Sequence, residues 1–154
     1  MPVAVSNLQR RRRISPPRLR AVARRTLAAL GRADREVHVT VVDDRRIRAL
    51  NARYLGRRRA TDVLAFDLAG PGPARLWGEV IVSAETAARQ ARRVGVPLAA
   101  ELDLLVVHGL LHLAGYDDHG PRRARRMHER ARQILGGQAP RAAPSRLWTG
   151  LLEA

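Results

Sequence analysis

Cysteine is absent from this chain of 154 residues. Its absence excludes disulfide bonds, thiolate nucleophiles and the cysteine-rich zinc folds, and it is compatible with a reducing cytosol. Any metal ion would have to be bound by histidine and carboxylate side chains. Long hydrophobic runs are absent too, and the amino terminus has no basic segment followed by an apolar stretch. We accordingly expect a soluble, cytoplasmic protein with no membrane partner.

Lysine is also missing, so all 29 basic side chains are arginines, and the formal net charge is +15. Such a surplus favours a polyanionic partner, and the planar guanidinium group matches phosphate well. The abundance of arginine, alanine, leucine and glycine indicates a GC-biased coding sequence, so a single arginine is weak support for any function. An isolated run such as Arg10 to Arg13 is more simply a solvated surface. For the whole chain we expect a nucleic acid partner.

Aromatic side chains are scarce. The chain has five of them: Tyr54, Phe66, Trp77, Tyr116 and Trp148. Proteins that read single-stranded RNA by stacking need exposed aromatic platforms, and few are left here once a core is filled. We therefore expect binding that is directed mainly at the phosphate backbone.

The hydrophobic pattern predicts a single domain over residues 1–136 that mixes a small sheet with helices. Alternating or β-branched apolar runs predict strands at residues 3–6, 37–42, 62–66 and 77–82. Apolar residues at helical spacing, bounded by capping residues, proline or glycine, predict helices at residues 16–30, 44–55, 84–94, 97–114 and 121–135. We expect residues 137–154 to form a loose tail.

Two histidines, His108 and His112, lie four residues apart in the fourth predicted helix. Residues at this spacing share one helical face, so both imidazoles can reach one ion. A catalytic zinc ion usually takes three protein ligands, and the turn at Gly115 brings further candidate ligands directly after the helix. The alternative is a hydrogen-bonded pair of core histidines. Because burying two imidazoles in an apolar helix is unfavourable unless each has a partner, we interpret the pair as a metal site.

Several further motifs occur together over roughly residues 37–135. The further motifs are Val41–Asp44, Leu50-Asn51 with Tyr54, Thr61–Leu64 with Phe66, and Gly78–Ser83. The histidine motif, His108–Asp117, follows them in the chain. In these motifs the chain closely resembles the YbeY family, which consists of metal-dependent endoribonucleases of bacterial ribosomal RNA maturation and ribosome quality control.

The resemblance implies an α+β fold, in which a small mixed four-stranded sheet packs with about five helices and the metal-binding helix is central. It also implies one bound zinc ion and cleavage of single-stranded RNA. The expected substrate is ribosomal RNA at the 3' end of the small-subunit species, and the expected partner is the small ribosomal subunit. Binding to DNA is not expected.

The chain departs from the family's pattern at the third metal ligand. The family's third histidine falls at Asp118, and His119 follows one residue later. Spacing favours Asp118 as the third ligand, whereas ligand chemistry favours His119, because neutral imidazole suits zinc and carboxylate is used less often. Both remain candidates, with a slight preference for Asp118.

A second departure lies at Leu55, where many members carry an arginine near the active site. Leucine cannot replace that charge. Arg57, Arg58 or Arg59 could reach the scissile phosphate instead, although a solvated loop explains this triplet equally well.

Zinc proteases with two histidines at this spacing carry a glutamate directly after the first one, as general base, and here that residue is Gly109. Its absence disfavours peptide hydrolysis. Phosphodiester cleavage depends less on such a glutamate, because a zinc-bound water has its pKa lowered towards about 7 and the ion polarises a phosphoryl oxygen. Arginine would supplement the ion electrostatically.

Other polar residues are candidate helpers in the reaction. Glu79, in a predicted strand, is a candidate base or orienting group. Asp62 is more simply a satisfied structural group, and Glu101 a surface carboxylate near the start of its helix. We assign neither His38 nor His128 to the metal.

The sequence thus predicts a zinc-dependent endoribonuclease. The main alternative is a ribosome-associated assembly factor that holds RNA without cutting it and contains a structural metal. A metallopeptidase is the least favoured hypothesis.

Overall fold

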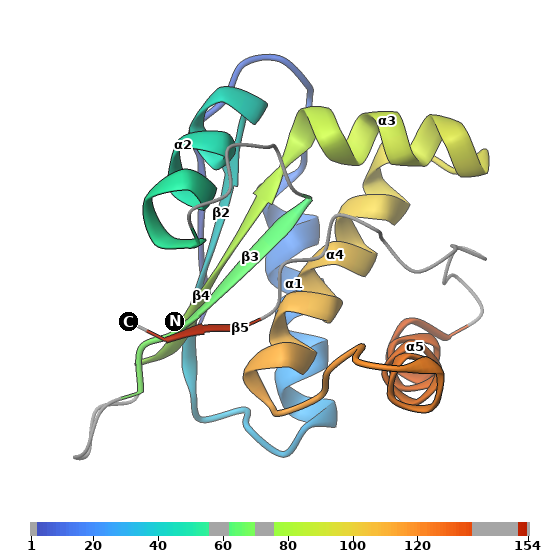
Figure 1. The fold of residues 1–154 in the computed structure, drawn as a ribbon. Coiled ribbons are helices and arrows are strands. Elements are labelled where there is room, and N and C mark those ends of the chain that lie inside the picture. Colours follow the sequence, from blue (N-terminus) through green and yellow to red (C-terminus); the bar gives the residue numbers. More distant parts are fainter. Residues whose placement is uncertain (1–2, 56–61, 70–75, 137–150, 154) are drawn as a thin grey trace.

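A computed structural model describes residues 3–55, 62–69, 76–136 and 151–153 of the chain (Figure 1). Its elements are, in order, β1 (Val3–Asn7), α1 (Pro16–Ala29), β2 (Glu36–Val42), α2 (Asp44–Leu55), β3 (Val63–Asp67), β4 (Leu76–Ser83), α3 (Ala84–Val94), α4 (Leu98–Leu113), α5 (Pro121–Leu135) and β5 (Leu151–Glu153). The predicted helices and strands are therefore all present, at the places that the sequence indicates.

The strands form one mixed sheet in the order β1-β2-β4-β3-β5. β1 and β2 pair in parallel, as do β2 and β4, whereas β3 runs antiparallel to β4. The expected α+β fold is confirmed, with one addition at the sheet edge. β5 pairs in parallel with β3, so these three residues of the predicted loose tail are in fact a strand. A run this short cannot display the alternation by which a strand is recognised in a sequence.

Helices cover both faces of the sheet (Figure 1). α1 and α4 pack on one face, over a core that includes Leu19, Val39 and Leu105. α2 packs on the other face, over a smaller cluster that includes Ile47 and Leu64. Two cores arise because successive side chains of a strand point to opposite faces. α5 lies on the far side of α4 from the sheet and contacts α4 and α1.

α4 is the central helix of the domain. Twelve of its 16 residues are buried, which explains why its sequence has almost no polar face. It contacts β3 and β4 below and α1, α3 and α5 around it. In the part of the chain that the structure describes, no single helix has the length and apolar character to cross a membrane. α3 and α4 together meet that criterion by length and composition only, and they are bent by 114°.

Candidate metal centre

α4 carries His108 and His112 on one face near its carboxyl end. His112 is 3% exposed, and the Nε2 atoms of both rings are buried. The rest of the helix is fixed against the sheet by its apolar residues, so the two imidazoles are held one turn apart. The structure therefore places the pair as the sequence spacing predicts.

Both rings are neutral at physiological pH. Burial, with a smaller contribution from the nearby His128, lowers the pKa of His108 to about 4. Burial also lowers the pKa of His112 to about 3; His108 and His119 act in the same direction, and Asp117 in the opposite one. Neutral imidazole is the form that binds zinc, so two buried neutral rings one turn apart fit two positions of a zinc site.

The chain turns immediately after α4. Gly115 has a φ of +100°, a conformation that residues with a Cβ atom rarely adopt. In the turn, Asp117 accepts a hydrogen bond from the backbone amide of His119 at 2.9 Å and another from Arg123 at 3.3 Å. The His119 amide and the Arg123 charge hold the pKa of Asp117 below its usual value. Asp117 thus shapes the turn.

Both candidates for the third ligand lie in this turn. The side chain of His119 is 83% exposed, and its Nδ1 atom lies 3.5 Å from Asp117 Oδ1. Asp118 is half-buried. Among the residues described, no three histidine, aspartate or glutamate side chains converge closely enough to hold an ion. α4 therefore supplies a preformed pair, and the third ligand stays a prediction.

α5 brings a further histidine to the pair. The ring centroids of His108 and His128 lie 6.4 Å apart, with an angle of 60° between the ring planes. No local spacing signals this contact, because it arises only when α5 packs across α4. His128 is half-buried, so its ring links the buried pair to the outer surface of α5.

Glu101 differs from its sequence prediction. It is 3% exposed rather than a surface carboxylate. Burial, with a smaller contribution from the buried Asp62 carboxylate, raises the pKa of Glu101 to about 7. Asp62 itself accepts hydrogen bonds from the Val63 amide at 2.9 Å and from Gln90 at 3.3 Å, as expected for a structural group.

Glu79 also requires a correction. Gly109 of α4 faces Val80 of β4, and adjacent strand residues point to opposite faces. Glu79 therefore points away from α4 and its histidines, where its Oε2 accepts a hydrogen bond from Thr40 at 2.7 Å. We exclude it from the candidate machinery. The predictions that involve Arg57, Arg58, Arg59 and the Leu55 side chain lie outside the described part of the chain.

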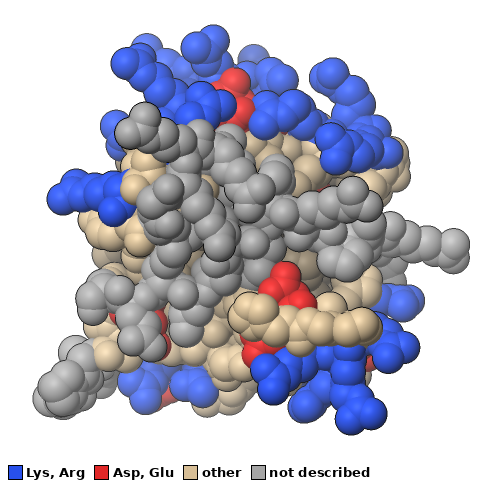
Figure 2. Space-filling view, in the orientation of Figure 1, with Lys and Arg blue, Asp and Glu red and all other residues tan. Residues whose placement is uncertain are grey.

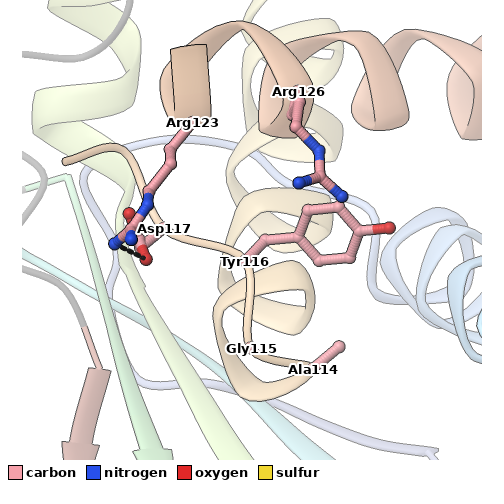
Figure 3. Close-up of a pocket in the computed structure, with 6 residues that line it drawn as sticks. All are labelled: Ala114, Gly115, Tyr116, Asp117, Arg123 and Arg126. Atoms are coloured by element: carbon pink, nitrogen blue, oxygen red, sulfur yellow. Dashed lines mark hydrogen bonds and ion pairs between the residues drawn. The ribbon is translucent and has the colours of Figure 1, made fainter. Parts of the chain in front are cut away.

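A cavity of about 530 Å³ opens beside the carboxyl end of α4. Its walls come from the turn and from α5 (Figure 3), and they are formed by Ala114, Gly115, Tyr116, Asp117, Arg123 and Arg126. Figure 3 shows both arginines extending from α5 towards the turn, with Arg123 reaching Asp117. The cavity thus combines cationic and aromatic groups next to the histidine helix.

The sequence model of the Endoribonuclease YbeY family matches residues 4–138. The chain belongs to this family. A YbeY endoribonuclease of Anaeromyxobacter sp. strain Fw109-5 is 46% identical over 153 residues, which cover 95% of this chain and 80% of the relative. A YbeY endoribonuclease of Geobacter metallireducens is 45% identical over 142 residues, which cover 88% and 94% of the two chains.

The fold has a counterpart among solved structures. The solution structure of TM1509 from Thermotoga maritima superimposes with a TM-score of 0.60 and 24% identity, over 87% of this chain and 89% of that one. At this identity the likeness concerns the fold alone. YbeY membership, in contrast, rests on the sequence match, which spans both the histidine helix and the sheet.

Proposed function

We propose that this protein is a zinc-dependent endoribonuclease that cuts single-stranded RNA. The observation that carries the proposal is the pair of neutral imidazoles of His108 and His112, one helical turn apart and each with a buried Nε2 atom. A turn with further ligand-type side chains follows them at once. Membership of a family described as endoribonucleases supports the reaction class. The net charge of +15 supports an RNA substrate.

The donor set supports one zinc ion. His108 and His112 would hold it, together with Asp118 or His119 from the turn. When bound, such an ion lowers the pKa of coordinated water towards about 7 and polarises a phosphoryl oxygen. The buried helix keeps both imidazoles neutral and in place, so no proton has to leave them before the ion binds.

The surrounding residues favour phosphodiester cleavage over peptide hydrolysis. Gly109 occupies the position at which zinc proteases carry their glutamate base. Arg123 and Arg126 line the adjacent cavity, where cationic groups would stabilise negative charge on a phosphate. We further propose that the substrate is ribosomal RNA, at the 3' end of the small-subunit species, and that the protein works in the cytoplasm in ribosome maturation and quality control.

Cleavage of a labelled single-stranded RNA by zinc-loaded protein tests the proposal. His108→Ala should lose about 100-fold or more of the activity, together with its stoichiometric zinc. His38→Ala is the matched control, because it removes an exposed imidazole on β2 and should keep both. Equal cleavage by wild type and His108→Ala would indicate a contaminating nuclease and would refute the mechanism.

The non-catalytic alternative makes a different prediction. If the metal is structural, zinc-loaded wild type will bind single-stranded RNA without cutting it, and removal of the metal will unfold the domain.

A precursor that spans the 3' end of small-subunit ribosomal RNA tests the proposed substrate. The endoribonuclease should cut it in its single-stranded part, and a complementary strand should protect that part. Cleavage that ignores the complementary strand would contradict single-strand specificity.

A further inference from the structure

α5 presents a strongly basic outer face. Its sequence from Pro121 to Leu135 contains six arginines and one acidic residue, Glu129. Figure 2 shows basic side chains gathered around the position of α5 at the lower right. The inner face of the helix is apolar, with Met127 and Ile134 buried in the core. The charge is therefore confined to the surface that faces solvent.

The arginines of this face differ in what they contact. Arg130 donates a hydrogen bond to the carbonyl of Ala29 at 2.7 Å, so it fastens α5 to the end of α1. Arg123 is partly neutralised by Asp117, at 3.3 Å. Arg126, in contrast, forms no ion pair with any residue that the structure describes. Its guanidinium group is therefore available to an external anion.

Two cavities meet at Tyr116. The first is the cavity of about 530 Å³ at the turn, and the second, of about 550 Å³, lies along the outer side of α5. Tyr116 and Arg126 line both of them. Figure 3 shows the guanidinium of Arg126 pointing towards the Tyr116 ring. Each volume lies in the range of about 300–1,000 Å³ that is typical of ligand pockets.

The second cavity approaches the histidine pair through His128. His128 is part of its lining, and the His128 ring lies 6.4 Å from that of His108. The first cavity is lined by Ala114 and Gly115, the two residues that follow α4. A chain of phosphates held by α5 would therefore pass beside the candidate metal centre.

We propose that Tyr116, Arg123 and Arg126 form a nucleotide-binding subsite for single-stranded RNA that leads into the metal centre. One base stacks on the Tyr116 ring, and the arginines contact its flanking phosphates. The inference rests on the proposed function, because it names residues that hold that substrate. It also revises the sequence-based expectation that aromatic residues take little part in binding.

The charge contribution is tested by measuring how a fluorescent 2'-O-methyl RNA hexamer binds to the zinc-loaded protein over a series of salt concentrations. A gel checks that the RNA stays intact during the measurement. Arg123→Gln/Arg126→Gln should weaken binding at least about tenfold and reduce the slope of log K against log salt by about 1.4, or 0.7 per lost phosphate contact. Arg92→Gln/Arg93→Gln removes the same charge from exposed positions on α3 and should change the slope by less than half as much.

The aromatic contribution is tested separately at Tyr116. Tyr116→Leu should weaken binding about fivefold or more without changing the salt slope, because stacking releases no counterions. Tyr116→Phe keeps the ring and should bind like the wild type. Thermal unfolding of each variant identifies any loss of RNA affinity that comes from misfolding. If Tyr116→Leu does not fold, the Arg123→Gln/Arg126→Gln variant gives an independent readout, because both arginines are exposed.

The outcomes separate this proposal from the proposed function. The subsite is wrong if wild type cuts RNA but the double variants of α5 and α3 lose equal RNA affinity, or if Tyr116→Leu binds RNA like wild type. The proposed endoribonuclease function would not be affected by that result. If zinc-loaded wild type neither binds nor cuts RNA, the proposed function itself fails. Selective losses in the α5 pair and in Tyr116→Leu, with rescue by phenylalanine, support the subsite.

Discussion

Gly109 of α4 lies directly against Val80 of β4: a Cβ atom at residue 109 would stand 2.5 Å from Val80 Cγ1 and 2.9 Å from Val80 Cγ2. Val80 is fully buried, so it has little room to move aside. The residue directly after the first histidine is therefore a point of close contact between α4 and the sheet. A glutamate base of the protease type cannot be accommodated there unless the helix moves away.

Gly109→Ala should therefore destabilise the domain although alanine favours helices. Overpacking against Val80 should cost about 1–3 kcal/mol. Helix propensity offsets about 1 kcal/mol of this cost, so we expect a net loss of up to about 2 kcal/mol. Urea unfolding of the zinc-loaded protein measures the loss. In a double-mutant cycle, Val80→Ala should relieve part of it, giving a combined loss smaller than the sum. Wild-type stability in Gly109→Ala would show that α4 does not rest on β4 as described.

Glu101 should make the domain less stable as the pH rises. Its pKa is raised to about 7 in the folded state, above the unfolded value of 4.5, so ionisation favours the unfolded chain. Stability is then highest below about pH 4.5 and falls as the pH rises through 7. Glu101→Gln should match wild type near pH 4 and exceed it by about 3 kcal/mol near pH 8.

Unfolding by urea at several pH values measures this difference. Glu129→Gln is the matched control, since it removes the same charge from an exposed position on α5 and should leave the pH profile unchanged. A constant difference between Glu101→Gln and wild type from pH 4 to pH 8 would mean that Glu101 is not buried as a raised-pKa carboxyl group.

The histidine pair should act in the opposite direction in metal-free protein. The folded pKa values of His108 and His112, about 4 and about 3, lie below the unfolded value of 6.5, so protonation favours the unfolded chain. Their contribution to the free energy of unfolding is complete above about pH 6.5 and is lost as the pH falls towards 4. We expect each histidine to account for about 2 kcal/mol of lost stability between pH 7 and pH 5.

Chelator-treated Glu101→Gln protein isolates this effect, because the opposing carboxyl group is absent. Adding His112→Gln should flatten the acid limb of its stability profile, whereas adding His38→Gln, at an exposed position, should not. An unchanged acid limb after the loss of His112 would contradict a buried, neutral imidazole.

Local pattern was sufficient for most of the fold and for the first two candidate ligands. The helix starts at Ser15 and Ser83 follow from capping, since each side chain accepts a hydrogen bond from a backbone amide of the first turn. The His108–His112 pair follows from helical periodicity. These features depend on residues close together in the chain, so they are visible without knowledge of the tertiary structure.

Features that depend on packing between distant segments could not be predicted. Glu101 lies near the start of its helix, and its burial and the nearby Asp62, which precedes β3, arise only from tertiary packing. Glu79 belongs to a run in which Val80, Ile81 and Val82 are all buried, so no alternation revealed which face it occupies. His128 reaches His108 only through the crossing of α5 over α4.

The third metal ligand can be identified by zinc affinity. We predict that Asp118→Asn lowers the affinity by about 100-fold, because removal of a charged ligand leaves two imidazoles alone. His119→Gln should change it only a few-fold, because His119 is 83% exposed and lies beside Asp117. Competition with a chromophoric chelator measures both affinities. Asp34→Asn and His38→Gln, which alter exposed residues of the same types, should leave them unchanged.

The reverse result would carry a structural consequence of its own. A large loss in His119→Gln with none in Asp118→Asn would assign the ligand to His119. Because the His119 side chain is 83% exposed, that assignment would require the turn between Gly115 and Gly120 to rotate inwards when zinc binds. Amide hydrogen exchange would detect that rotation as new protection at residues 116–120 on addition of zinc, whereas ligation by the half-buried Asp118 requires a smaller change.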